Sequence, residues 1–207
     1  MATVLQINSS LHGEAGQSSR LADELVARLQ QQNPSLKRVV RDLAAQPVPH
    51  LDAHRFAAFT TPAGERDAQQ QAVVAQSDQL ISELREAEVI VLGLPMYNFG
   101  VPSQLKAYFD HVARAGETFR YSDKGPIGLL KGKRAYVLAT RGGQYAGTTL
   151  DTQTGYIRDF LRFIGIEQVE FIYAEGLAIG DESRDSALAA ARSRIQALAQ
   201  VCLANAA

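Results

Sequence analysis

The 207-residue sequence has a single cysteine, no tryptophan and no excess of charge of either sign. One cysteine, Cys202, excludes an intrachain disulfide and any metal site built from several cysteines. A formal net charge of -1 provides no attraction to nucleic acid or to an anionic membrane. No apolar run is long enough to cross a bilayer, and the short N-terminal one does not resemble a signal peptide. We therefore expect a cytoplasmic protein without nucleic-acid or membrane partners.

Several common site signatures are also missing. The chain contains neither a G-x-G-x-x-G run nor a P-loop, which disfavours dinucleotide and ATP sites of those types. His50 and His54 are four residues apart, but no cluster of acidic or cysteine ligands accompanies them, so we predict no metal. Asp110 and His111 are consecutive on a predicted helix and point in different directions, which disfavours a hydrolase site with Ser103. We expect His111 at the surface or at an interface.

Segments with strand-like and helix-like apolar spacing alternate along the whole chain. The predicted strands are residues 3–7, 37–42, 88–94, 134–139 and 168–174. The predicted helices are about residues 19–32, 66–84, 102–112, 152–164 and 183–203. This alternation is typical of an α/β fold with a parallel sheet covered by helices on both faces. We interpret residues 1–207 as one domain.

Two segments depart from the alternation. Residues 44–65 contain three prolines and show no sustained period, so we interpret them as a long excursion, a type of loop that often acts as a lid. Residues 116–133 are predicted to be a second loop.

Three irregular loops follow the first, third and fourth predicted strands, at residues 8–18, 95–100 and 140–143. In open parallel sheets, ligands bind at the carboxyl ends of the strands, where the winding reverses. We therefore expect the three loops to converge on one crevice.

The first loop is rich in hydroxyl groups and precedes a helix. Its polar residues are Ser9, Ser10, Gln17, Ser18 and Ser19. Free helix amides, the helix dipole and hydroxyl donors together favour a phosphate there. Taken alone, the loop is better explained as a capped turn with solvated serines, because serine is common at helix N-caps.

The second loop is unusually aromatic for a strand-to-helix turn. Met96, Tyr97 and Phe99 could form walls around a flat ligand, while Asn98 and backbone amides address its polar edge. The alternative is that these side chains close the top of the sheet as core. In the third loop, the paired glycines Gly142 and Gly143 allow backbone to approach a ligand, although a simple turn would use them too.

These segments, in order, resemble the FMN-dependent NADH-azoreductases, bacterial members of the flavodoxin-like quinone reductases. The resemblance is carried by Asn8-Ser9-Ser10, Gln17-Ser18, Pro95-Met-Tyr-Asn-Phe99, Lys106-x-Tyr-Phe-Asp110-x-Val-x-Arg-x-Gly116-x-Thr-Phe119, Arg141-Gly-Gly143 and Ala174-Glu-Gly176. It implies a flavodoxin-like three-layer α/β sandwich with a five-stranded parallel sheet. It also implies a homodimer with one FMN per subunit at the interface.

The resemblance further assigns residues to the cofactor. The phosphate end of FMN would be held by Ser10, Gly16, Gln17 and Ser18. The isoalloxazine ring would be held by Met96, Tyr97, Asn98 and Phe99 on one side and by Thr140, Arg141, Gly142 and Gly143 on the other. Gly16 and Thr140 stand where the family commonly has serine, and Gly16 can offer only its amide.

Members of the family pass electrons from NADH or NADPH to quinones, and to azo compounds that are cleaved to amines, in ping-pong fashion. The flavin carries this chemistry, so we expect no catalytic side chain. Phe119, Tyr121, Phe56 and Phe59 are candidates for substrate contact or closure of the cleft, with local packing as the alternative.

Two other classes of function remain. A flavodoxin-type electron carrier would bind FMN but would need a docking protein in place of a small substrate. A receiver-type regulatory module is disfavoured, because no acidic cluster follows the first strand. The sequence does not choose between NADH and NADPH, and it does not identify the physiological acceptor.

Overall fold

A computed structural model describes residues 2–204 of the chain, and the side chains of residues 2–198. Five strands form one parallel sheet in the order β2-β1-β3-β6-β7. They are β1 (Thr3–Asn8), β2 (Lys37–Asp42), β3 (Val89–Pro95), β6 (Arg134–Thr140) and β7 (Gln168–Ala174). The predicted five-stranded parallel sheet is confirmed, with boundaries within two residues of those expected.

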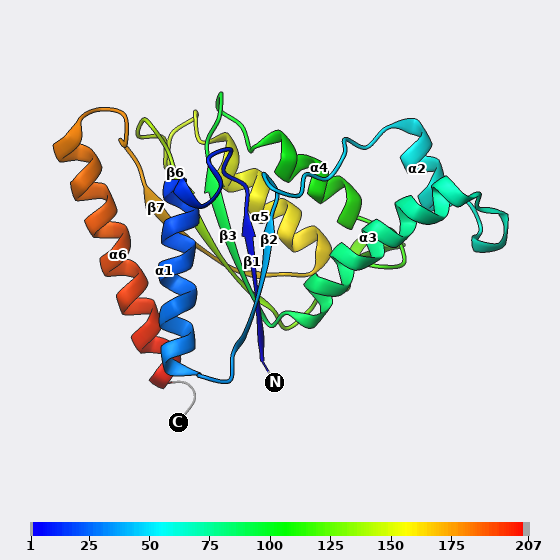
Figure 1. The fold of residues 1–207 in the computed structure, drawn as a ribbon, viewed down its shortest axis with the longest axis horizontal. Coiled ribbons are helices and arrows are strands. Elements are labelled where there is room, and N and C mark those ends of the chain that lie inside the picture. Colours follow the sequence, from blue (N-terminus) through cyan, green and yellow to red (C-terminus); the bar gives the residue numbers. More distant parts are fainter. Residues whose placement is uncertain (1, 205–207) are drawn as a thin grey trace.

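Helices cover both faces of this sheet (Figure 1). On one face lie α1 (Gln17–Gln32) and α6 (Asp181–Ala204). On the other face lie α3 (Ala68–Glu86), α4 (Ser103–Val112) and α5 (Thr152–Ile164). The predicted three-layer sandwich is therefore confirmed.

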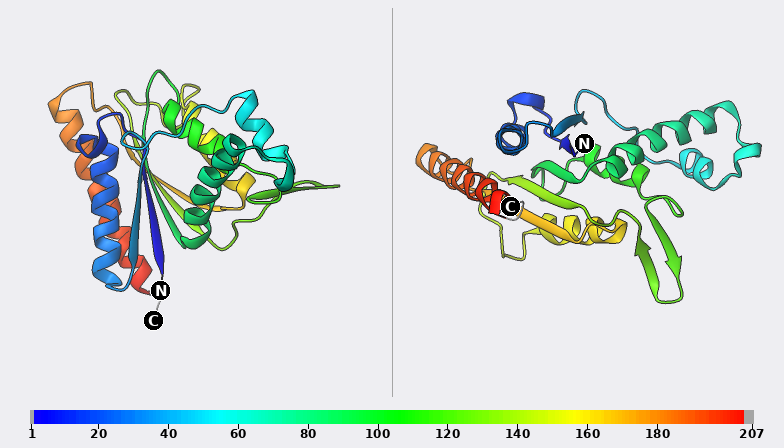
Figure 2. Two further views of the ribbon diagram at one scale, coloured as in Figure 1. Left: turned by 45° about the vertical axis from the view of Figure 1, so that its right-hand side comes forward. Right: turned by 90° about the horizontal axis from the view of Figure 1, so that it is seen from below.

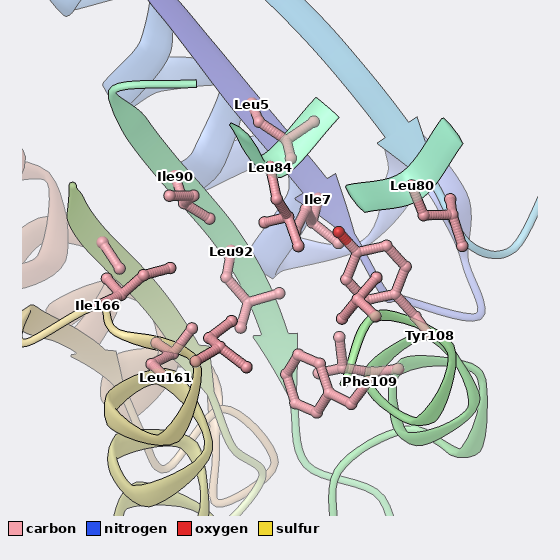
Figure 3. Close-up of a cluster of buried hydrophobic side chains, with 14 of the residues drawn as sticks. Leu5, Ile7, Leu80, Leu84, Ile90, Leu92, Tyr108, Phe109, Leu161 and Ile166 are labelled. Atoms are coloured by element: carbon pink, nitrogen blue, oxygen red, sulfur yellow. The ribbon is translucent and has the colours of Figure 1, made fainter. Parts of the chain in front are cut away.

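The three central strands β1, β3 and β6 are buried along almost their whole length. Leu5, Ile90 and Leu92 project from the sheet towards α3, α4 and α5, where they meet Leu84 and Phe109 (Figure 3). A strand covered on both faces has no polar face, which explains why these segments are nearly continuous apolar runs in the sequence. The edge strands β2 and β7 are only partly buried.

The excursion at residues 44–65 is more regular than predicted. It contains the helix α2 (Ala53–Thr60) and a 3-10 turn, η2 (Ala63–Glu65). Asp52 begins α2, because its side chain accepts a hydrogen bond of 2.7 Å from the amide of Arg55. Two helical turns between prolines are too short for an apolar period to show, so the sequence pattern missed this helix.

Residues 116–133 also contain structure that was not predicted. The antiparallel strands β4 (Phe119–Ser122) and β5 (Gly125–Gly128) form a hairpin that projects from the body of the molecule (Figure 2). Each strand has only four residues, and two of the four positions of β5 are glycine, so neither resembles a typical strand.

The strand register aligns the carboxyl ends of the central strands. Pro95 at the end of β3 pairs with Thr140 at the end of β6, and Asn8 at the end of β1 pairs with Gly93. The first loop, which includes the 3-10 turn η1 (Gly13–Ala15), therefore starts beside the second and third loops. Within residues 2–204, no helix combines the length and apolarity needed to cross a membrane.

Candidate functional site

The three loops meet at the carboxyl ends of the strands, as predicted. The hydroxyl of Tyr97, in the second loop, accepts a hydrogen bond of 3.2 Å from the amide of Leu11 and lies 3.4 Å from Ser10 Oγ, both in the first loop. The amide of Met96 donates to the carbonyl of Thr140, which begins the third loop, at 3.0 Å. Tyr97 and Met96 thus join the second loop to its two neighbours.

The second loop contains a tight turn over residues 97–100. The amide of Gly100 donates to the Tyr97 carbonyl at 2.9 Å, and the amide of Tyr97 donates to the Gly100 carbonyl at 3.2 Å. The two central residues are Asn98, with a φ of 49°, and Phe99, with a φ of 61°. Positive φ at a bulky residue costs on the order of 1 kcal/mol, and such strain persists only where surrounding contacts hold it.

The geometry of this turn leaves two backbone donors available. Within the part of the chain that the structure describes, the amides of Asn98 and Phe99 donate to no protein acceptor. Phe99 is 50% exposed, and its ring meets that of Tyr145 edge-on at 5.5 Å between centroids. The turn therefore presents two free N–H groups beside an accessible aromatic surface.

The start of α5 holds this turn in place. Gln153 Nε2 donates to the carbonyls of Pro95 and Gly100, each at 2.9 Å, and Thr152 Oγ1 donates to the carbonyl of Phe99. Neither residue is among those predicted for the site, because both are more than 50 positions from the loop. One signal was present: Gln153 is four residues before Ile157 on the buried stripe of the helix, where an apolar residue is expected.

The first loop provides an open helix N-terminus. No side chain caps α1, and Gly16 occupies its N-cap position. The hydroxyl oxygens of Ser18 and Ser19 are buried and have no hydrogen-bond partner among the described residues. Free amides and unpaired hydroxyls at the positive end of a helix form a suitable environment for a phosphate.

The structure also explains why glycine stands at position 16. A Cβ placed there would lie 2.2 Å from Ser10 Oγ. Ser10 therefore occupies the space that a serine side chain at position 16 would need, and it supplies a hydroxyl to the same region. Ser10 is 2% exposed, and its Oγ accepts a hydrogen bond of 3.2 Å from the amide of His12.

In the third loop, the side chain of Arg141 is turned to the protein. Its guanidinium pairs with Asp151 at 2.7 Å and with Glu175 at 3.0 Å. Glu175 Oε1 in turn accepts from the amide of Tyr145 at 2.9 Å. Burial favours the neutral form of Asp151, but hydrogen bonds from Arg141 and Thr154 outweigh it, so the pKa of this carboxyl lies below its ordinary value.

The backbone of Arg141 is occupied as well. Its amide donates to the carbonyl of Ala174 at 3.0 Å, and its carbonyl accepts from Leu177 at 3.1 Å. Arg141 therefore supports the loop, while the amides of Gly142 and Gly143 have no acceptor among the described residues. Of the four candidates in this loop, the two glycines have the backbone donors that remain available to a ligand.

Phe119 and Tyr121 do not lie at the convergence of the loops in this chain. They are on the β4–β5 hairpin, where the Phe119 ring packs 4.3 Å from that of Phe163 near the end of α5. Gln153 is at the start of α5, and a helix rises about 1.5 Å per residue, so roughly 15 Å separates the two regions. Tyr121 is 74% exposed on the projecting hairpin. Phe119 therefore packs near the end of α5, whereas the second loop is held at its start.

Phe56 and Phe59 are also placed away from the loops. Phe59 packs with Ala58 against Val73 and Val74 of α3, and its ring meets His111 edge-on at 5.8 Å. Phe56 is 57% exposed on α2. Local packing therefore describes Phe59 in this chain, and neither ring contacts the second loop.

The prediction for His111 was wrong. Its side chain is fully buried, because α2 and α3 cover the face of α4 on which it lies, and its Nδ1 is 2.9 Å from the carbonyl of Ala107. Burial lowers the pKa of His111, although the contact with the Ala107 carbonyl acts in the opposite direction.

A hollow of about 450 Å³ lies beside the second loop. Its lining residues are His50, Phe99, Gly100, Val101, Ser103, Lys106, Thr152 and Tyr156. Burial, and then the charge of Asp110, raises the pKa of Tyr156 to about 12, so this phenol stays protonated at neutral pH. The hollow places an apolar surface next to the free amides of the turn.

Comparison with known proteins agrees with this geometry. The family model described as flavodoxin-like fold matches residues 2–199. The chain is 57% identical over 197 residues to FMN-dependent NADH:quinone oxidoreductase 6 of Burkholderia lata, covering 95% of this chain and 100% of that protein. It is 56% identical over 196 residues to the FMN-dependent NADH:quinone oxidoreductase of Cellvibrio japonicus, covering 95% and 98%.

Solved structures show the same arrangement. An azoreductase from Bacillus anthracis str. Sterne matches with a TM-score of 0.87 at 24% identity, over 96% of this chain and 99% of that one. An FMN-dependent NADH-azoreductase from Bacillus anthracis str. Ames Ancestor, in complex with FMN, matches with a TM-score of 0.85 at 26% identity, over 96% and 100%. The chain therefore belongs to the flavodoxin-like fold family and, within it, to the family of FMN-dependent NADH:quinone oxidoreductases.

Proposed function

We propose that this protein binds FMN and passes electrons from NADH or NADPH to quinones, and that it also reductively cleaves aromatic azo compounds to amines. The observation that carries the proposal is the turn at residues 97–100, whose strained backbone presents two unpaired amides at the carboxyl ends of a parallel sheet. The identity to the named quinone oxidoreductases supports the same assignment. Cytoplasmic location is part of this proposal, and the lack of paired cysteines favours it.

The unpaired polar groups of the site fit FMN. The buried Ser18 hydroxyl and the open N-terminus of α1 suit the phosphate, with Ser10 and the amide of Gln17 beside them. The amide of Gly16 already donates to the carbonyl of Gly13 at 3.2 Å, so Gly16 would contribute close approach of the backbone. The free amides of Asn98 and Phe99 suit the polar edge of the isoalloxazine, and those of Gly142 and Gly143 suit its other side. Met96 and Tyr97 join these regions. Of the remaining predicted residues, Arg141 would hold the loops, while Thr140 holds Met96 through its carbonyl and has a hydroxyl available to the cofactor.

Bound FMN would supply the hydride and two-electron chemistry that links the nicotinamide to the acceptor. The chain itself has to bind and orient the cofactor and the substrates, and to exclude water from them. Phe99 and Val101 provide the apolar surface on which a flat acceptor would lie, and Tyr145 supports the Phe99 ring. Tyr156 keeps its proton at neutral pH, so it contributes a neutral aromatic surface. No side chain is assigned a proton-transfer step.

A homodimer is the second part of the proposal. The hollow beside Phe99 is open, and Phe99 and Leu150 are each 50% exposed next to the loops. Tyr121 projects on a hairpin that reaches no loop of its own subunit. A second copy of the chain would cover the exposed apolar surface and bring Tyr121 towards the other subunit's hollow, with the buried Phe119 ring supporting Tyr121 from behind. Sedimentation should then show a dimer, and a monomer with full turnover would contradict this arrangement.

Stopped-flow reduction is the decisive experiment for the proposed activity. The purified protein, loaded with added FMN, should show loss of the oxidised flavin absorbance when mixed with NADH or NADPH. Addition of benzoquinone should then restore it within the turnover time. Protein that binds no FMN would refute the proposal. Bound FMN that neither nicotinamide reduces would instead favour an electron carrier of the flavodoxin type.

A further inference from the structure

Gln153 is a polar residue in an apolar position. It lies on the buried stripe of α5 with Ile157, Leu161 and Ile164, and its side chain is fully buried. Burying an amide is unfavourable unless its hydrogen bonds are satisfied. Both donated bonds of Gln153 go to the second loop, while its Oε1 has no partner among the described residues. An apolar residue of similar size would fill the same space without leaving an acceptor unpaired.

The two bonds bracket the strained turn. Pro95 is the last residue of β3 and Gly100 closes the turn, and the same amide nitrogen holds both carbonyls at 2.9 Å. This assignment also identifies which amide atom faces the loop, because two carbonyl acceptors require a donor between them. Gln153 therefore ties the turn to the end of its strand and to the rigid start of α5.

The restraint extends to the free amides. The Tyr97 carbonyl accepts from the amide of Gly100, and in a planar peptide unit that carbonyl sets the direction of the Asn98 N–H. Gly100 is in turn held by Gln153, and Thr152 holds the carbonyl of Phe99 in between. With Asn98 and Phe99 both at positive φ, the unrestrained turn would relax to other conformations.

We propose that Gln153 is a positioning residue for the flavin, which aims the Asn98 and Phe99 amides and thereby favours the reduced cofactor. The inference rests on the proposed function, because it assumes that FMN binds against this turn. Donors held in a fixed direction beside a group that gains electrons stabilise its electron-rich form, whereas mobile donors lose part of that effect. Loss of the clamp is therefore expected to lower the flavin midpoint potential.

The test compares Gln153→Met with Gln30→Met. Methionine keeps the length of the side chain and removes both donors. Gln30 is the matched control, because its Nε2 also donates to a backbone carbonyl, that of Leu36 at 3.1 Å, but on α1. We expect Gln153→Met to reduce the ratio of affinities for reduced and oxidised FMN about tenfold, which lowers the two-electron midpoint potential by about 30 mV. Gln30→Met should leave the potential unchanged.

A second readout requires no flavin. NMR relaxation of the FMN-free protein should show backbone order parameters at Asn98 and Phe99 falling from about 0.85 to below about 0.6 in Gln153→Met. An unchanged potential in the loaded variant would overturn the proposal, even if the turn became mobile. A wild-type protein that binds no FMN would refute the proposed function, and the role of Gln153 with it.

Thr152 offers a parallel test if Gln153→Met fails to fold. Its side chain is exposed, so Thr152→Val removes the bond to the Phe99 carbonyl with little effect on the core. Thr152→Ser retains the hydroxyl. We expect Thr152→Val to lower the flavin midpoint potential, with a change of less than tenfold in the ratio of affinities for reduced and oxidised FMN. Thr152→Ser should have the wild-type potential. Equal potentials for the two variants would contradict the clamp.

Discussion

The loop at residues 95–100 and the excursion at residues 44–65 each expose a phenylalanine, but they are stabilised in different ways. In the loop, Phe99 has positive φ, and polar bonds from α5 hold its turn. In the excursion, α2 is an ordinary capped helix, and Phe59 packs it against its neighbours. Strain together with unpaired donors marks the first as a binding element, while capping and packing mark the second as structure. An exposed aromatic residue alone does not distinguish the two.

The largest effect is expected from the buried ion pairs that support the strand-end loops. Arg141→Met would leave Asp151 and Glu175 without their shared cation, although both carboxylates are mostly buried. Breaking such a cluster costs about 3–5 kcal/mol in the free energy of unfolding. Urea denaturation measures this loss. Arg192→Met, which breaks an exposed pair with Glu24, is the control and should cost less than about 1 kcal/mol.

If Arg141→Met cost as little stability as Arg192→Met, polar anchoring would not distinguish the strand-end loops from the excursion. The comparison would then rest on the backbone strain at Asn98 and Phe99 alone.

The excursion provides the second prediction. Phe59→Ala removes a ring that packs on Val73 and Val74, on His111 and on the guanidinium of Arg114, 5.1 Å from the ring centroid. For this half-buried ring we expect a loss of about 2 kcal/mol in stability, with FMN affinity unchanged. Phe56→Ala, on the exposed side of the same helix, should change stability by less than about 0.5 kcal/mol. Flavin titration of both variants measures the affinity.

His50 of the excursion already lines the hollow beside Phe99, so a weakened FMN affinity in Phe59→Ala would show that α2 acts on the site as well, as the lid that the sequence suggested. In that case the loop and the excursion would both take part in binding the cofactor.

The smallest effect is the pH dependence of the excursion's packing. His111 is buried, which holds its pKa below the ordinary value near 6.5. The charges that act on it are those of Arg55, Asp110 and Asp52. The unfolded chain binds this proton more readily than the native one. The contribution of neutral His111 to the free energy of unfolding is therefore fully present above about pH 6.5, and it is lost as the pH decreases towards the lowered pKa. We expect a loss of about 1 kcal/mol or less between pH 7.5 and 5.5.

Thermal melts across this pH range test the prediction. In His111→Asn the amide can still donate to the Ala107 carbonyl but does not titrate, so the slope should be shallower than in the wild type. Equal slopes would assign the acid sensitivity to other groups.

Much of the fold could be predicted because buried strands and amphipathic helices have distinct periods. The helix at Thr152–Ile164 and the strand at Gln168–Ala174 were predicted to the residue, since each has a clear apolar pattern and a polar or glycine boundary. The elements that were missed, α2 and the β4–β5 hairpin, are too short to show a period. Their conformations depend on a cap and on packing against other elements.

The sequence by itself determined the sheet, the three loops at its carboxyl edge and the aromatic character of the middle loop, because these follow from local patterns and from the rule of parallel-sheet topology. Only the tertiary structure decided what each loop residue does. It turned Arg141 inward, placed Ser10 in the space beside Gly16, buried His111 and brought Gln153 beneath the turn. Such contacts join residues far apart in the chain, and their geometry exists only after the helices have packed on the sheet.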